Sequence, residues 1–442
     1  MHRVNHQSAV RSSAAAVRYE RPSIYTIIKE HLFRNDICIF YQTIFCIFNR
    51  IFYKYGIIEP NYLTFGSIYS KIGQWKGDRT MDGSFNAPLL PLQSGIIDQA
   101  NFLNELIDAT AKLEVYKEKI RDSKLNASWF MPTLQQKEAL ASSALEGTQA
   151  TLDGVLINQV NPNDRDKNLN EVSNYYSATI LGYDILRRHD FSNDFFFDIH
   201  KTLMAGNVRK PKVVGEYRTE QNYIGKNDSS HAITFIPPVP EKVPELMANL
   251  IRYINVPEDH LRPLVRTAII HAQFETIHPF MDGNGRVGRM LIPMYLFFQK
   301  QIDLPCFFIS EALERDKIKY YTLLNNIRNN GDWNEWIRFF LTTVIRQCTK
   351  YIQMITDINA LYEKHLDIAT KMARSSNMVD IINVLYQNPV VSSKKIAELT
   401  KIPPTSINRY LSLLVEAKIL FTDNKRKNRT YYYYELMDIL RA

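Results

Sequence analysis

Apolar residues recur at helical spacing along most of the chain. In 263–276 they stand at positions 264, 265, 268, 269 and 272, so they share one face of a helix. Similar patterns predict further helices, and we expect an all-α fold. A capping pattern at Thr133 opens one of these helices. The others cover about 97–125, 170–188, 194–205, 240–253, 286–298, 311–328 and 329–361.

Two segments depart from the helical pattern. Short β-branched and aromatic runs flank 225–230, which is rich in polar turn residues, and this predicts a β-hairpin. Near the C-terminal end, residues 377–442 read as a separate unit with helices at 377–388, 393–400 and 404–417. Two strand-like pieces follow within 420–435, around a basic turn. This order resembles a winged helix-turn-helix domain.

The composition is that of a folded globular protein, with 442 residues, 45% hydrophobic and 23% charged. The four cysteines show no paired spacing, which favours a reducing compartment such as the cytoplasm. We expect an N-terminal helical region at 81–205, a core at 206–365 and the C-terminal unit at 377–442.

Residues 1–80 differ from the rest of the chain. They carry eleven Lys or Arg and five Asp or Glu, so six of the eight net positive charges lie here. The apolar run 37–48 is too short to span a bilayer. Two interpretations are open: translation starts at Met81 and this leader is an artefact, or the leader is an interfacial membrane-binding segment. We expect no membrane contact for the remaining chain. Its net charge does not indicate nucleic-acid binding.

Twelve consecutive residues concentrate the chemistry, in the order His278-Pro-Phe-Met-Asp282-Gly283-Asn284-Gly285-Arg286-Val-Gly-Arg289. His278 is the natural proton acceptor, because imidazole titrates near neutrality. Asp282 is a hard oxygen ligand that suits Mg²⁺. The glycines around Asn284 permit a row of inward-facing N–H groups at a helix N-terminus. Arg286 and Arg289 share a helix face and can bind phosphate.

Other phosphate and metal motifs fit less well. Residues 283–288 read G-x-G-x-x-G, but a helix is predicted before them, whereas a dinucleotide-binding turn needs a strand. No Gly-Lys-Ser/Thr follows, which excludes a P-loop. His271 and His278 lack the partners of a zinc site, so we expect His271 to be a hydrogen-bonded core residue. For His200 we expect a structural or surface role.

The stretch 278–289 matches the pattern H-P-F-x-D-G-N-G-R-x-x-R at every fixed position, and so it resembles the signature of the Fic family of protein AMP-transferases. The resemblance implies a helical Fic core with a hairpin flap, and AMP transfer from ATP, with Mg²⁺, to a Ser, Thr or Tyr hydroxyl of a protein. By this resemblance His278 is the base and Asp282 holds the metal. The implied phosphate-binding residues are Gly283, Asn284, Gly285, Arg286 and Arg289. Related kinases carry lysine in place of Gly285, which favours AMP transfer here.

Ser142-Ser-Ala-Leu-Glu146-Gly147 resembles the inhibitory motif of the same family, [S/T]-x-x-x-E-[G/N]. The resemblance implies that Glu146 pairs with Arg289 and occupies the γ-phosphate site. A charge-assisted hydrogen bond of this kind contributes about 1.5–3 kcal/mol, which suits a switch rather than a permanent block.

The resemblance also suggests residues for the target and for adenine. A flap positions its target by strand addition, and the flap residues here are Ile224, Gly225, His231 and Ala232. Tyr321 and Asn329 are the candidates for the adenine pocket, although a tyrosine on a core-facing helix stripe explains Tyr321 equally well.

In a DNA-binding winged helix, the third helix enters the major groove. The residues near bases would then be Thr405, Ser406, Asn408 and Arg409, and those at phosphates would be Lys425, Arg426, Lys427 and Arg429. The recognition helix carries little charge, so dimerisation or target docking by this unit is an open alternative.

The leading hypothesis is a protein adenylyltransferase that is restrained by Glu146. Its partners would be a protein substrate, the protein itself as a second substrate, and a second copy in a homodimer. Two alternatives stay open. One is a DNA-binding transcriptional regulator whose Fic fold senses nucleotide. The other is a hydrolase that removes AMP from modified proteins, with Glu146 orienting a water.

Overall fold

The computed structural model describes residues 83–123, 127–161, 166–206, 213–225, 233–304, 306–373, 375–423, 425 and 429–442. Residue contacts divide the chain into Met1–Ile72 and Gly73–Ala442, and every described residue belongs to the second unit. The leader 1–80, His231, Ala232, Arg426 and Lys427 lie outside the described residues. None of the described helices combines the length and apolar composition that a membrane crossing requires.

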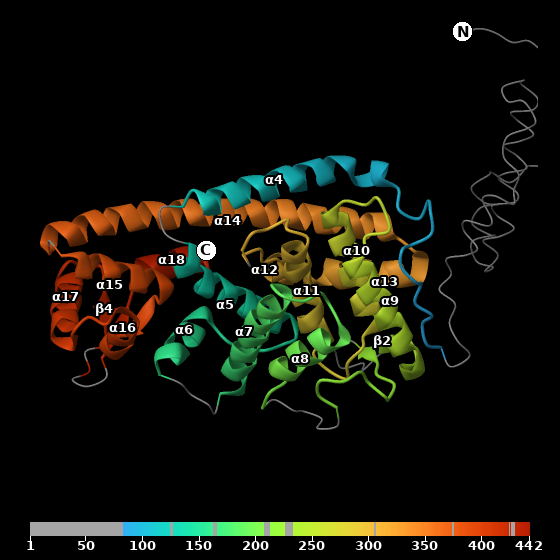
Figure 1. Ribbon diagram of the computed structural model, residues 1–442, viewed down its shortest axis with the longest axis horizontal. Coiled ribbons are helices and arrows are strands. Elements are labelled where there is room, and N and C mark those ends of the chain that lie inside the picture. Colours follow the sequence, from blue (N-terminus) through green and yellow to red (C-terminus); the bar gives the residue numbers. More distant parts are fainter. Residues whose placement is uncertain are drawn as a thin grey trace, which may run out of the picture. The chain divides into compact units, whose positions relative to one another are not determined.

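The prediction of an all-α fold is confirmed (Figure 1). The helices before the C-terminal unit are η1 Gln99–Phe102, α4 Leu103–Arg121, α5 Ala127–Leu145, α6 Leu152–Val160, α7 Lys167–Leu186, α8 Asn193–Leu203, η2 Pro240–Lys242, α9 Val243–Asn255, α10 Pro263–Ile277, α11 Asn284–Phe298, α12 Ser310–Arg315, α13 Lys317–Asn330 and α14 Trp333–Met372.

Helix α10 is buried along almost its whole length. Every residue from Leu264 to Ile277 is buried, and the helix packs against α9, α11, α13 and α14. The Trp336 indole of α14 donates a hydrogen bond to the Ala268 carbonyl (2.9 Å). A helix held on all sides fixes the position of whatever follows its last turn, and that residue is His278.

Three helix boundaries differ from the sequence prediction. Helix α5 begins at Ala127 and runs through Pro132, so the predicted start at Thr133 is wrong. The single helix predicted over 311–328 is two helices that break at Asp316, whose carboxylate pairs with Arg346 of α14 (2.5 Å). Helix α14 runs on to Met372 instead of ending near 361, because its later turns pack on the C-terminal unit. In the last two cases a tertiary contact overrides the local pattern.

The predicted hairpin is present. Strands β1 Ile224–Gly225 and β2 Ile233–Phe235 are antiparallel, with Ile224 opposite Phe235. The N-terminal segment adds to this structure, since the Phe85 N–H donates to the Ile236 carbonyl (3.0 Å) and the Phe85 ring packs on Phe235 at 5.5 Å.

The C-terminal unit has the winged-helix arrangement. It contains α15 Ser376–Gln387, β3 Val390–Ser392, α16 Ser393–Thr400, α17 Pro404–Glu416, β4 Phe421–Thr422, β5 Thr430–Tyr432 and α18 Tyr434–Arg441, with strand order β3-β5-β4. Strand β3 and helix α18 were not predicted.

This unit packs on the N-terminal helices. Helix α15 packs against α5, and the Thr133 hydroxyl donates to the Gln387 carbonyl (3.4 Å). Arg441 forms an ion pair with Asp153 of α6 (2.7 Å). The winged helix therefore contacts the same helix whose end carries Glu146.

Candidate active site

His278 occupies a strained position at the C-terminal end of α10. Its φ of 52° lies in the left-handed region, and its N–H donates to the Phe274 carbonyl (2.9 Å). Nδ1 lies 3.4 Å from the Glu275 carbonyl oxygen, which can only accept, so this contact puts hydrogen on Nδ1 and leaves Nε2 unprotonated and able to accept a proton. Burial, reinforced by the charge of Arg328, lowers the pKa of His278 to about 3. The ring is therefore neutral near pH 7.

Arg218 holds the backbone on both sides of this histidine, a role that sequence reasoning missed. The buried guanidinium donates from Nε to the His278 carbonyl (2.9 Å) and from Nη2 to the carbonyls of Ile277 (3.4 Å) and Pro238. The Arg218 N–H donates to the Pro279 carbonyl (2.9 Å). The base of the flap and the histidine loop are thereby tied together.

Two asparagines shape the loop after His278. The Asn284 amide accepts from the Phe280 N–H (2.8 Å) and donates to the Phe280 carbonyl (2.7 Å). The Asn222 amide donates to the same carbonyl (2.9 Å). Asn284 was predicted to bind nucleotide. In the structure its side chain holds the backbone of the loop that leads into α11.

The structural expectations for the other two histidines are confirmed. The His200 ring stacks on Phe280 (3.9 Å between centroids), and its Nε2 lies 3.0 Å from the Asp282 carbonyl. His271 contacts the Gly288 carbonyl (2.8 Å) and the Tyr320 hydroxyl (2.9 Å). Both histidines therefore contact backbone carbonyls within residues 278–289 and help to hold that segment in place.

Two glycines leave room at the start of α11. Gly283 has a φ of 79°, and a Cβ there would lie 3.1 Å from the Met204 sulfur. A Cβ at Gly285 would lie 2.2 Å from Oε1 of Glu146 and 2.9 Å from Nη1 of Arg289. A carboxylate thus already occupies the space over Gly285, at a helix N-terminus that favours anions.

Both predicted arginines are buried beside this space. The Nε atom of Arg286 has no hydrogen-bond partner among the described residues, and its Nη2 lies 3.8 Å from the carboxylate of Asp282. Arg289 donates from Nε to the Ser142 hydroxyl (2.8 Å) and from Nη2 to the Ser142 carbonyl (2.9 Å). Buried guanidinium groups with donors to spare are suited to a bound polyphosphate.

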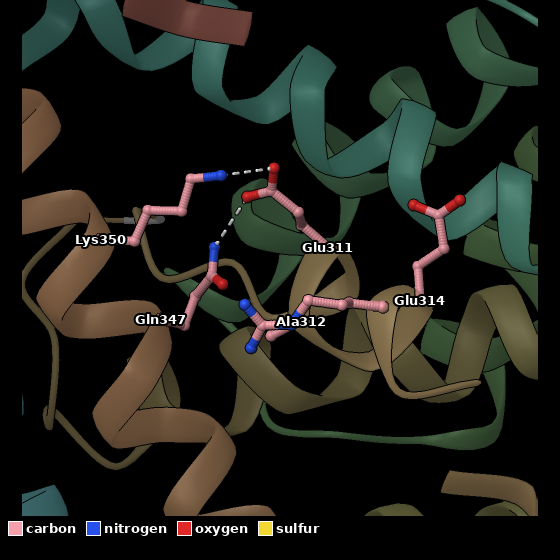
Figure 2. Close-up of a pocket in the computed structure, with 6 residues that line it drawn as sticks. Glu311, Ala312, Glu314, Gln347 and Lys350 are labelled. Atoms are coloured by element: carbon pink, nitrogen blue, oxygen red, sulfur yellow. Dashed lines mark hydrogen bonds and ion pairs between the residues drawn. The ribbon is translucent and has the colours of Figure 1, made fainter. Parts of the chain in front are cut away.

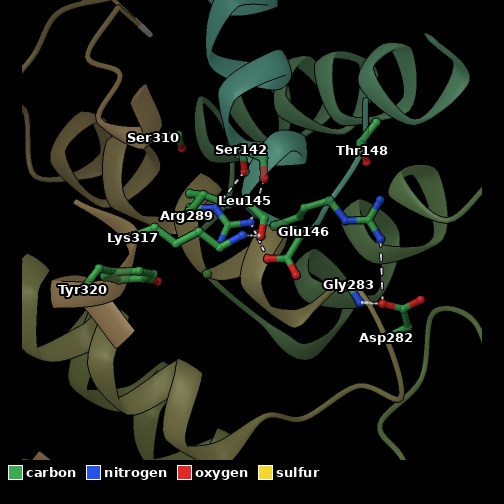
Figure 3. A network of polar contacts seen from close by, with 12 residues as sticks. Ser142, Leu145, Glu146, Thr148, Asp282, Gly283, Arg289, Ser310, Lys317 and Tyr320 are labelled. Atoms are coloured by element: carbon green, nitrogen blue, oxygen red, sulfur yellow. Dashed lines mark hydrogen bonds and ion pairs between the residues drawn. The ribbon is translucent and has the colours of Figure 1, made fainter. Parts of the chain in front are cut away.

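The ion pair between Glu146 and Arg289 crosses the site (Figure 3). Nη2 of Arg289 lies 2.6 Å from Oε1 of Glu146. Burial raises the pKa of Glu146, but the guanidinium of Arg289 outweighs it, so this pKa lies below its usual range and the group is ionised. The carboxylate follows the last residue of α5, where the helix dipole disfavours negative charge. Arg289 is therefore its principal support.

Helix α5 is anchored to α12 and α13 upstream of Glu146. The Glu138 carboxylate accepts hydrogen bonds from the Ser310 N–H (3.0 Å) and hydroxyl. Lys317 donates to the Leu145 carbonyl (2.8 Å), as Figure 3 shows. These contacts hold the helix while leaving the Glu146 side chain, which is 37% exposed, free to turn away.

A separate polar pocket of about 310 Å³ lies between α12 and α14 (Figure 2). Glu311 is its centre, with Lys350 at 2.9 Å and Gln347 at 3.3 Å. Lys137 of α5 reaches Glu311 from the other side (3.2 Å). No residue of 278–289 lines this pocket, so it is not the candidate active site.

Asp282, the predicted metal ligand, has an exposed carboxylate beside the start of α11. Its side chain is 56% exposed, and Oδ1 accepts from the Gly283 N–H (2.6 Å). The described residues contain no cluster of three or more His, Cys, Asp or Glu that could hold a metal. A single exposed carboxylate fits Mg²⁺, which keeps most of its waters and is held largely by substrate phosphates.

The two adenine candidates lie on α13. The Tyr321 ring packs at 4.9 Å from Tyr320, and the residue is close enough to Glu146 and Arg289 to interact with them electrostatically. Asn329 lies near the exposed end of the same helix. The structure thus places Tyr321 at the arginine side of the site, while the adenine assignment stays a prediction.

A neutral histidine, buried arginines and a glycine-lined helix start lie together in a site whose cationic groups suit a polyphosphate. Family models match the parts of the chain that carry these residues. The Fic/DOC family model matches residues 190–296, and the Fic/DOC N-terminal model matches 103–184. A winged helix-turn-helix DNA-binding model matches 374–420. The chain therefore carries the two Fic/DOC domains and a C-terminal winged helix-turn-helix domain.

Relatives of known name share parts of this chain. The protein adenylyltransferase fic-1 of Caenorhabditis briggsae is 30% identical over 154 residues, which cover 34% of this chain and 27% of that protein. The protein adenylyltransferase Fic of Culex quinquefasciatus is 28% identical over 227 residues, covering 50% and 39%. The matched part thus spans well under half of each relative's length.

A solved structure shows the same fold. A Fic family protein from Desulfovibrio desulfuricans G20 superposes with a TM-score of 0.50 at 20% identity, covering 77% of this chain and 98% of that one. At this identity the likeness concerns the fold alone.

Proposed function

We propose that this protein transfers AMP from ATP to a Ser, Thr or Tyr hydroxyl of a protein target, and to itself, under restraint by Glu146. The observation that carries the proposal is the Glu146–Arg289 ion pair beside the neutral His278. A carboxylate already fills an anion site at the start of α11, next to a positioned base. The names of the relatives, protein adenylyltransferases, support the same reaction.

The geometry suggests how the transfer proceeds. Nε2 of His278 takes the proton of the target hydroxyl, and the hydroxyl oxygen forms a bond to the α-phosphorus of ATP. The bond from that phosphorus to the bridging oxygen breaks, and pyrophosphate leaves. The N-terminus of α11 and Arg286 stabilise the negative charge that develops on the phosphate oxygens. Arg218 holds the His278 carbonyl and so keeps the ring in place.

Asp282 would hold the magnesium ion that accompanies ATP. Bound there, the ion would neutralise part of the phosphate charge.

Glu146 restrains this reaction by competing for Arg289. While the ion pair is closed, Arg289 cannot bind the γ-phosphate of ATP. ATP therefore cannot bind with its α-phosphate in line with the target hydroxyl. Because Ser142 also holds Arg289, the guanidinium stays in position when Glu146 turns away. Release therefore needs only a side-chain movement, which costs far less than unfolding α5.

A second candidate function is DNA binding by the winged helix. Thr405, Asn408 and Arg409 are exposed along one face of α17, and Ser406 is partly exposed, so the predicted recognition face is open. The matching family model is described as DNA-binding. Sequence-specific binding that resists salt, measured by selection from random duplexes, would support this function.

The reaction type can be tested with labelled ATP on the full-length Glu146→Gly protein. Label on the α-phosphate should enter protein, while label on the γ-phosphate should not. Entry of γ-label would instead indicate phosphate transfer. Loss of label from a modified protein in a chase without ATP would indicate hydrolysis as the main activity.

A further inference from the structure

Glu275 is a buried carboxyl group that the mechanism above leaves unused. It lies on α10, three residues before His278, and is only 6% exposed. Its Oε1 atom has no hydrogen-bond partner among the described residues. An unpartnered buried oxygen of this kind destabilises a fold, so the presence of a glutamate here requires a physical explanation.

Gly288 makes the space that this carboxyl occupies. A Cβ at Gly288 would lie 2.2 Å from Oε1 of Glu275 and 3.1 Å from the Phe274 ring. The carboxyl therefore rests on the backbone of α11 at the residue just before Arg289. Gly288 lies outside the fixed positions of the sequence pattern, and Glu275 precedes that pattern.

The carboxyl interacts electrostatically with the same arginine that Glu146 binds, without an ion pair between the two side chains among the described residues. Burial raises the pKa of Glu275 to about 7, with Arg289 and Arg328 opposing the rise and Glu146 adding to it. His271 and His278 on its own helix stay neutral, because burial lowers both pKa values to about 3. The charged or titratable groups that interact with Glu275 are Arg289 of α11, Arg328, Tyr320 and Tyr321 of α13, and Glu146 at the end of α5.

We infer that Glu275 is a positioning residue for the triphosphate: it takes up a proton from solvent when the γ-phosphate binds Arg289, and so makes ATP binding depend on pH while ADP binding does not. The inference rests on the proposed function, because it uses the assignment of the γ-phosphate to Arg289. An ionised Glu275 would compete with the γ-phosphate for that guanidinium. A neutral Glu275 fills the space without competing.

The sign of the effect follows from the charges. A bound γ-phosphate adds negative charge near Glu275 and raises its pKa further, so ATP favours the protonated form. In the chain with Glu146, ATP affinity is then highest below about pH 7 and falls as pH rises above it; without Glu146 the pKa of Glu275 is lower, so the fall begins at a lower pH. If the phosphate raises the pKa by one unit, the loss approaches about tenfold.

The test compares full-length proteins with Glu275 and with Glu275→Gln. Both carry Glu146→Gly, to remove the competing carboxylate, and His278→Ala, to prevent turnover. Affinities for ATP and ADP with Mg²⁺ are measured by calorimetry at about pH 6 and about pH 8.5. Between these pH values we expect ATP affinity to fall about tenfold with Glu275 and less than about twofold in the Glu275→Gln protein, while ADP behaves alike in both proteins.

The matched variant separates a positioning role from a structural one. Any pH effect of ATP itself is shared by both proteins, and a merely structural role would move the affinities for ATP and ADP together. If Glu275→Gln is not folded, Glu275→Ala combined with Gly288→Ala replaces it, because the new methyl group fills vacated space. Equal pH profiles with and without the acid would overturn the inference. If neither protein binds ATP, the proposed function itself fails, and the inference with it.

Discussion

Replacing Glu146 by Gln should raise the affinity for ATP about 10- to 30-fold. The variant keeps the shape of the side chain and removes its charge. The ion pair to Arg289 is 2.6 Å long, with Arg289 fully buried and Glu146 37% exposed. Charge-assisted hydrogen bonds contribute about 1.5–3 kcal/mol. Because solvent screens the partly exposed carboxylate, we expect this pair to contribute about 1.5–2 kcal/mol, in the lower half of that range. Since about 1.4 kcal/mol is tenfold in affinity, the expected gain follows.

The assay is calorimetric titration of full-length proteins that carry His278→Ala, so that no ATP is consumed. ATP and ADP are each titrated with Mg²⁺ into the protein with Glu146 and into the Glu146→Gln protein. Because Glu146 blocks only the arginine assigned to the γ-phosphate, ADP affinity should change less than about threefold. An equal gain for ADP and ATP, or no gain for ATP, would refute the competition between Glu146 and the γ-phosphate.

Three further predictions concern the supports of the site. Arg218→Lys should lower the free energy of unfolding by about 2–4 kcal/mol in urea, because it leaves buried carbonyls unpaired; an unchanged midpoint would contradict this. Gly288→Ala should cost about 1–3 kcal/mol in the same assay and much less alongside Glu275→Ala, whereas additive effects would mean that the two residues do not meet. Because the pKa of His278 is lowered to about 3, its base form persists in acid. Transfer by Glu146→Gly protein at saturating ATP should therefore stay level between about pH 7 and pH 5.5, and a tenfold fall would show an ordinary histidine pKa.

The chemistry of 278–289 was readable from the sequence because its parts are local. A base, a carboxylate, glycines and arginines lie within twelve residues, and a helix was expected on each side. Glu146 lies 143 residues from Arg289, and only the resemblance of its motif connected the two in advance. The structure brings them together because α5 is anchored to α12 and α13.

The supporting residues could not be predicted, because their partners are set by the tertiary fold. No sequence pattern marked out Arg218, and only the fold shows that it binds the backbone around His278. Glu275 lies on a helix that is buried all round, so no polar face marked it out. Gly288 stood out only as part of a misleading G-x-G-x-x-G pattern, and its role depends on the carboxyl packed against it.

The secondary-structure errors have a related cause. The break at Asp316 and the extension of α14 both depend on contacts between distant segments. Strand β3 is only three residues long and is defined by its pairing with β5, which lies about 40 residues later. Local patterns carry no signal for such pairings.

The most direct test of the central claim is entry of α-labelled phosphate into protein, compared among three full-length forms with ATP and Mg²⁺. These are the unmodified chain, Glu146→Gly, and Glu146→Gly combined with His278→Ala. The account predicts weak labelling of the first, strong labelling of the second and none of the third. Absence of label from all three, even with cell lysate supplied as acceptor, would contradict AMP transfer as the main activity.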